Sequence, residues 1–175
     1  IAAAENVFKE AVARHDTAVA AHLALGAFYQ LAGRMDEAKN LLEGVTARFD
    51  TSAAARVTLA AFYQAAGQGD LAERSYLQAI VMAPQDVRVH MGLAHYQASI
   101  EKSEEAIKSY NLALKVDPGS VAARKHLAYQ FLRTGKLDES DRLLGDLSGS
   151  GIDANYLKGR LLLARGDYTR GVGLL

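Results

Sequence analysis

The feature that most constrains this chain is an internal repeat. The segment GAFYQLAG at residues 26–33 returns almost unchanged as AAFYQAAG at residues 60–67, a step of 34 positions. The same step separates the chain's two prolines, Pro84 and Pro118. A leucine followed by a small residue keeps this step through four copies, at Leu25-Gly26, Leu59-Ala60, Leu93-Ala94 and Leu127-Ala128. A fixed period of this length indicates stacked structural repeats, so it governs the interpretation of every shorter motif.

Each repeat is predicted to contain two antiparallel helices, and residues 53–86 show why. Apolar residues recur at helical spacing in residues 53–66, which gives this first helix one apolar face. Gly67 is predicted to end it, because glycine adopts the left-handed conformation of a helix stop at the least cost. A second helix is predicted from near Asp70, whose charge favours a helix N-terminus, to just before Pro84, which cannot continue a helix.

Polar residues precede three of the first helices, and a side-chain oxygen there can accept a hydrogen bond from the helix's free N–H groups. These predicted N-caps are Ser52, Asp86 and Ser120. Within residues 53–86, Ala60 and Ala72 are small enough for the two helices to approach closely. A pair of short helices cannot bury its apolar face alone, so stacking of neighbouring pairs is predicted to complete the core.

The pattern resembles the tetratricopeptide repeat (TPR) family, whose repeat places small, aromatic and proline residues at fixed positions. The most complete copy has Ala60, Tyr63, Ala72, Tyr76, Ala79 and Pro84 at these positions. The resemblance implies an all-α fold, a right-handed α-solenoid of antiparallel helix pairs. It divides a single array into residues 1–18 (the second helix of a preceding repeat), repeats at 19–52, 53–86, 87–120 and 121–151, and a partial repeat at 152–175. We therefore expect a fragment of a longer TPR protein.

The third repeat leaves two registers open. The segment His95-Tyr96-Gln97 matches Phe62-Tyr63-Gln64 at a step of 33 positions, whereas Leu93, Ala94 and Ala106 keep the step of 34. The sequence favours 34, and a shift by one residue would change which side chains of this helix face a groove. In the fifth repeat the pattern begins three residues early, which predicts a shortened connection near residues 148–151.

No catalytic, cofactor or metal site is predicted. The chain contains no cysteine, which excludes a disulfide framework, a thiolate zinc site and a cysteine nucleophile. His22 and His90 occupy the same repeat position, which indicates packing, and no histidine pair has the i,i+4 spacing of a zinc-binding helix. The glycine-rich segment 145–151 lacks the Lys-Ser/Thr ending of a phosphate-binding loop and is interpreted as a turn between repeats. A non-catalytic protein is therefore expected.

The resemblance implies that the first helices of the repeats line a concave groove that takes a partner segment. The groove positions within residues 19–86 are mostly small, apolar and uncharged. From residue 88 onward, basic and aromatic side chains alternate there, and His126, Asp153 and Leu157 also occupy groove positions. Nine residues are predicted to contact the partner: Gln30, Gln64, Arg88, His95, Lys125, Tyr129, Arg133, Tyr156 and Arg160.

A protein or peptide with acidic groups is the expected partner, because the later groove positions carry Arg and Lys. Two alternatives remain. In the first, these charges solvate an exposed face and contact no partner. In the second, the basic and aromatic side chains bind single-stranded nucleic acid. A formal net charge of zero disfavours nucleic acid. TPR relatives that clamp a C-terminal carboxylate carry Asn where this chain has Tyr129 and Leu157, so that mode is not predicted.

The sequence thus predicts a protein-interaction scaffold. Long bacterial proteins that resemble it suggest a place in envelope, secretion or exopolysaccharide machinery. Two other functions stay open: a substrate-recruiting arm of a larger enzyme, and a self-assembly module joined through open repeat ends. No apolar run approaches the roughly 18 residues that a membrane-spanning helix needs. The sequence leaves the cellular compartment open.

Overall fold

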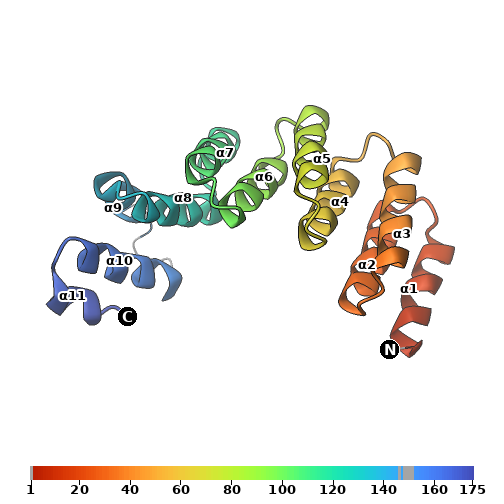
Figure 1. Cartoon of the computed structure of the whole chain (residues 1–175), viewed down its shortest axis with the longest axis horizontal. Helices are drawn as coiled ribbons and strands as arrows, with labels where there is room; N and C mark the ends of the chain where they lie inside the picture. Colours follow the sequence, from red (N-terminus) through yellow and green to blue (C-terminus); the bar gives the residue numbers. More distant parts are fainter. Residues whose placement is uncertain (1, 146, 148–151) are drawn as a thin grey trace. The chain divides into compact units, whose positions relative to one another are not determined.

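The computed structural model describes residues 2–145, 147 and 152–175, and these form eleven α-helices without a strand (Figure 1). The helices are α1 (Ala2–Arg14), α2 (Val19–Leu31), α3 (Met35–Arg48), α4 (Ala53–Ala65), α5 (Gly69–Met82), α6 (Val87–Ser99), α7 (Ser103–Val116), α8 (Val121–Arg133), α9 (Leu137–Gly145), α10 (Ile152–Ala164) and α11 (Tyr168–Val172). They group into two compact units, unit 1 (Ile1–Pro84) and unit 2 (Gln85–Leu175), which are described separately.

Packing within each unit follows the order of the chain. In unit 1, α2 packs on α3 and α4 on α5, while α1 covers α2 and α3 contacts α4 (Figure 1). In unit 2 the pairs are α6 with α7, α8 with α9, and α10 with α11. Helix α8 also contacts α7 and α10, so it joins all three pairs of unit 2.

The period of the sequence reappears in the helix boundaries. Helices α2, α4, α6 and α8 begin at residues 19, 53, 87 and 121 and are 13 residues long. Helix α6 begins at Val87, so its boundaries keep the step of 34 in the third repeat. Gln97 therefore takes the place that Tyr29 and Tyr63 have in the two preceding repeats. Helix α10 begins early relative to this period, but residues 148–151 of the shortened connection lie outside the described residues.

The predicted caps and stops explain these boundaries. Ser52 Oγ accepts a hydrogen bond from the Ala55 N–H at 3.2 Å, and Asp86 and Ser120 cap α6 and α8 in the same way. Gly33, Gly67 and Gly135 follow the first helices of their repeats with φ angles of 75°, 71° and 74°. In the third repeat Glu101 occupies this place with φ 62°, so a residue with a Cβ atom adopts the left-handed conformation there.

Replacing Glu101 by glycine is expected to raise the free energy of unfolding by about 0.5–1 kcal/mol, since relief of the left-handed strain outweighs the added freedom of the unfolded chain. Urea denaturation measures the change. The matched control is Gly67→Ala: a Cβ atom at Gly67 meets nothing within 4 Å, so its expected loss of about 1 kcal/mol comes from the backbone alone. A Glu101→Gly protein less stable than the parent contradicts the prediction.

Small residues let the two helices of each pair approach closely. The series Ala38, Ala72, Ala106 and Ser140 is 0% exposed. Ser140 of α9 shows where this series lies, because its Oγ donates a hydrogen bond to the backbone oxygen of Ala128 on α8 at 3.0 Å. At Gly26 of α2 a Cβ atom would lie 2.6 Å from Leu42 Cδ2 of α3, so the close approach there depends on glycine.

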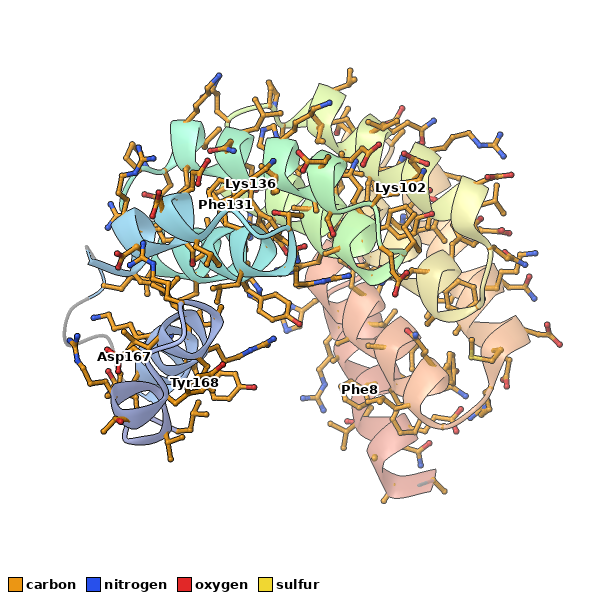
Figure 2. All side chains as sticks on the ribbon, turned by 60° about the vertical axis from the view of Figure 1, so that its left-hand side comes forward. Phe8, Lys102, Phe131, Lys136, Asp167 and Tyr168 are labelled. Carbon is orange, nitrogen blue, oxygen red and sulfur yellow. The ribbon has the colours of Figure 1, made fainter. Side chains whose placement is uncertain are left out.

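An aromatic contact and an ion pair hold α1 against α2 and against Arg34, which directly precedes α3, in unit 1. Phe8, labelled in Figure 2, lies with its ring 5.4 Å from that of Phe28. Beside this contact, Glu5 binds the Arg34 guanidinium at 2.6 Å and the Lys9 ammonium at 2.8 Å. The hydrogen bond from Arg34, with a smaller contribution from Lys9, lowers the pKa of Glu5 to about 2.

This lowered pKa predicts a specific loss of stability in acid. A carboxylate with a folded-state pKa below its unfolded value stabilises the fold above the unfolded pKa, and this contribution disappears as the pH falls through the folded pKa. For Glu5 the loss is expected between pH 4.5 and about pH 2. Thermal melts of the parent and of Glu5→Gln should therefore differ at neutral pH and converge near the acid end of that window. A difference that does not depend on pH would contradict the assignment.

Unit 2 has a similar ion pair between two repeats. Lys136, labelled in Figure 2, directly precedes α9. Its Nζ atom lies 2.7 Å from Glu104 Oε1 on α7. Phe131 lies nearby on α8 and packs against the buried cluster of Ala94, Ala106, Ile107, Tyr110 and Leu127. This cluster joins three helices of unit 2 and supports the α8 face described below. None of the helices in the described part of the chain is both long and apolar enough to cross a membrane.

Candidate partner-binding pocket

Two of the nine predicted contact residues lie in unit 1, where each is partly buried on the first helix of its repeat. Gln64 on α4 is partly buried and accepts a hydrogen bond from the Tyr76 hydroxyl of α5 at 3.2 Å. Gln30 is partly buried on α2. The adjacent tyrosines are core residues, as Tyr29 and Tyr63 are each 7% exposed. The tyrosine hydroxyls donate to the preceding repeat, Tyr29 to Glu5 and Tyr63 to Glu43, so the repeated FYQ motif contributes mainly to packing within and between repeats.

Arg88 lies in the first turn of α6, where its guanidinium binds the cap of its own helix. Its Nε and Nη2 atoms lie 2.9 and 2.5 Å from the two carboxylate oxygens of Asp86. This contact lowers the pKa of Asp86. The side chain of Arg88 is 80% exposed, but its charge is balanced locally by Asp86.

Three predicted residues meet in one pocket between α8 and α10. The pocket has a volume of about 220 Å³ and is lined by Lys125, His126, Tyr129, Asp153, Tyr156 and Leu157. Lys125, Tyr129 and Tyr156 are among the nine residues predicted from the sequence. His126, Asp153 and Leu157 occupy groove positions of the same helices but were not selected. The pocket therefore combines two neighbouring first helices of the array.

The charged and aromatic groups follow a definite order along the two helices. At one end Lys125 Nζ binds Asp153 Oδ2 at 3.1 Å. The two tyrosines follow one turn later on each helix, because residues three or four positions apart share a helix face. The Arg160 guanidinium lies over both rings, 5.4 Å from the Tyr129 centroid and 5.9 Å from that of Tyr156. A cation over an aromatic face at such distances is attracted by the ring's quadrupole.

Arg133 continues the α8 face by one further turn. Its Nη1 atom donates a long hydrogen bond of 3.5 Å to the backbone oxygen of Ala98 on α6. Within the described part of the chain, neither Arg133 nor Arg160 takes part in an ion pair, whereas Lys125 is neutralised by Asp153. Positive charge is thus concentrated at the Arg133 and Arg160 end of the pocket.

Three rings form the side of the site next to α6. The imidazole centroids of His95 and His126 lie 4.5 Å apart, and the His126 ring stacks on Tyr110 of α7 at 5.7 Å with an angle of 7° between the planes. Burial lowers the pKa of both histidines, and each also has a neighbouring basic group that lowers it further. Both rings are thereby held neutral to lower pH than an ordinary histidine.

Sequence reasoning missed the contribution of Tyr110. Its place at the aromatic position of a second helix indicated packing, and it is indeed 1% exposed. Nothing in the spacing indicated that its ring would support His126, which lies 16 positions further along the chain on another helix. Burial also raises the pKa of the Tyr110 hydroxyl above its usual range, so it carries no charge at the site.

Comparison with known families decides the assignment. A model of the tetratricopeptide repeat matches residues 1–53 and 32–96, and a second model of this repeat matches residues 87–120. The chain belongs to the tetratricopeptide repeat family. The predicted fold class, an all-α solenoid of antiparallel helix pairs, is confirmed. As a TPR fold, it is in general a protein-interaction scaffold that binds proteins or peptides.

Solved structures show the same fold at low sequence identity. The Pseudomonas aeruginosa pilF structure is 21% identical, has a TM-score of 0.77, and aligns over 91% of this TPR chain and 74% of its own. A TPR protein from Parabacteroides merdae is 19% identical, with a TM-score of 0.75 over 98% and 69% of the two chains. YrrB, described as a TPR protein with an unusual peptide-binding site, is 13% identical, with a TM-score of 0.66 over 95% and 88%. No curated protein matched the sequence.

Proposed function

We propose that this TPR chain binds a segment of a partner protein on the surface formed by α8 and α10. The observation that carries the proposal is the pocket of about 220 Å³, in which tyrosine rings, a leucine and charged groups converge. Ligand sites are concave and largely apolar, with a few placed polar groups. Tyr156 is 49% exposed, and exposed Tyr and Arg side chains at the centre of a contact surface contribute most to protein interfaces.

The interaction is proposed to be non-catalytic, so that the chain holds its partner without changing it covalently. YrrB supports peptide binding as a function of this fold, because it is described as a TPR protein with a peptide-binding site. A role in bacterial envelope, secretion or exopolysaccharide machinery remains part of the proposal, and the likeness to pilF concerns the fold alone. In the described residues, no contact favours the enzyme-arm or self-assembly alternatives over partner binding.

The direct test is selection of a random peptide library on the immobilised chain, followed by affinity measurements with synthetic copies of the enriched peptides. Tyr156→Ala is expected to weaken their binding about tenfold or more, the usual effect of removing a central aromatic contact. The matched control is Tyr168→Ala: Tyr168 lies on α11 of the same unit, is 69% exposed and does not line the pocket (Figure 2). Equal effects of the two substitutions, or no enriched peptide, would contradict the proposal.

A further inference from the structure

We infer that the bound segment carries one large apolar side chain that enters the pocket between α8 and α10, with a carboxylate beside it on the side of Arg133 and Arg160. The inference rests on the proposed function and adds the chemistry of the partner and its direction along the site. It also gives Asp153 a specific role, as the residue that prevents a partner carboxylate from using Lys125.

The size and lining of the pocket favour a single side chain as its occupant. Its volume of about 220 Å³ is below the 300–1,000 Å³ of sites that hold a drug-sized ligand. Leu157 is 7% exposed and lines the pocket together with Tyr129 and Tyr156. An aromatic or large aliphatic side chain matches these surfaces, because it would bury apolar area without leaving a polar group unpaired.

Charge fixes the direction of the segment. At the Lys125 end, Asp153 already neutralises the ammonium and would repel a second carboxylate nearby. At the opposite end Arg160 lies over the two rings, and Arg133 follows one turn beyond Tyr129 without an ionic partner in the described structure. A carboxylate next to the apolar side chain therefore finds net positive charge only on that side. Planar guanidinium groups also suit carboxylates because they can donate two parallel hydrogen bonds.

Asp153 is the feature that separates this inference from simple attraction of acids to a basic surface. Its side chain is 79% exposed, whereas that of Lys125 is 22% exposed, so Asp153 is the more accessible member of the pair. Removing the charge of Asp153 frees Lys125 without removing any positive group. Asp153→Asn is thus expected to strengthen binding of acidic peptides, a gain that damage to the fold would not produce.

The experiment uses the full chain and the enriched library peptides. The enriched sequences are expected to share an aromatic or large aliphatic residue with Asp or Glu within a few positions. Arg160→Gln is expected to weaken their binding at least about tenfold, Arg160→Lys less, and Asp153→Asn is expected to strengthen it several-fold at low salt. The matched control is Arg170→Gln, which removes an exposed arginine of α11 outside the pocket and should leave affinity unchanged.

The outcomes separate the inference from the proposed function. Peptides that bind and respond to Tyr156→Ala, but share no acidic residue or ignore both Arg160→Gln and Asp153→Asn, overturn the inference and leave partner binding in place. Absence of any enriched peptide overturns both. A single-stranded oligonucleotide that displaces the peptides with higher affinity identifies a nucleic-acid ligand and also overturns both. Melting curves of every variant establish that each remains folded, so that a loss of affinity refers to the site.

Discussion

Replacing Tyr110 by alanine is expected to lower the free energy of unfolding by about 3–5 kcal/mol, the range for truncation of a buried aromatic side chain. Tyr110 is 1% exposed and lies in the cluster that joins α6, α7 and α8. Its removal takes away buried apolar surface, leaves a cavity and removes the ring that both His95 and His126 contact. Urea denaturation followed by circular dichroism measures the loss.

Tyr110→Phe is the control for this prediction, because it keeps the ring and removes only the hydroxyl. Its expected cost is about 1 kcal/mol or less, the usual net contribution of one polar group. The alanine variant should also bind the selected peptides more weakly, since His126 lines the pocket and stacks on the Tyr110 ring. Equal stability of the two variants would show that the ring does not support this part of unit 2.

Replacing Ala72 by phenylalanine is the second large effect, with an expected loss of about 3 kcal/mol through overpacking. Ala72 is 0% exposed on α5 and is the counterpart of Ser140, whose side chain touches the backbone of the paired helix. A benzyl group there would push α5 away from α4, because interiors are packed at the density of organic crystals.

Ala61→Phe is the control, since it makes the same change at an exposed position of α4 in the same repeat. That variant is expected to melt within a few degrees of the parent, as surface substitutions usually change stability by less than about 0.5 kcal/mol. If Ala72→Phe also melts like the parent, the prediction that α4 and α5 approach closely at Ala72 is contradicted.

The fold was predictable because its determinants are local and repeated. The caps at Ser52, Asp86 and Ser120 and the stop at Gly67 act within a few residues of their own positions, so the sequence contains them directly. The open register of the third repeat had a physical cause. Gln97 replaces the aromatic residue, is 8% exposed, and accepts a hydrogen bond from Ser109 Oγ at 2.7 Å instead of packing a ring.

The candidate pocket was only partly predictable, because its chemistry depends on residues far apart in the chain. Family positions placed Lys125, Tyr129 and Tyr156 on the same surface, and the structure brings these three together. They did not indicate that Asp153 would neutralise Lys125, which requires the exact distance between α8 and α10 across a shortened connection. The sequence predicted acidic groups near Arg88, Lys125, Arg133 and Arg160, but the first two basic groups are paired with Asp86 and Asp153. The proposed site for a partner carboxylate is therefore limited to Arg133 and Arg160.

The regular helix boundaries have a consequence for the history of the protein. A single period such as residues 52–85 contains the cap Ser52, the stop Gly67 and both faces needed to stack on a neighbour. Tandem duplication of such a segment in the gene inserts a unit that folds by the same local rules and leaves existing contacts in register. Copying of this kind would produce near-identical segments such as those at residues 26–33 and 60–67. Array length can thus change in evolution while the pocket of unit 2 diverges on its own.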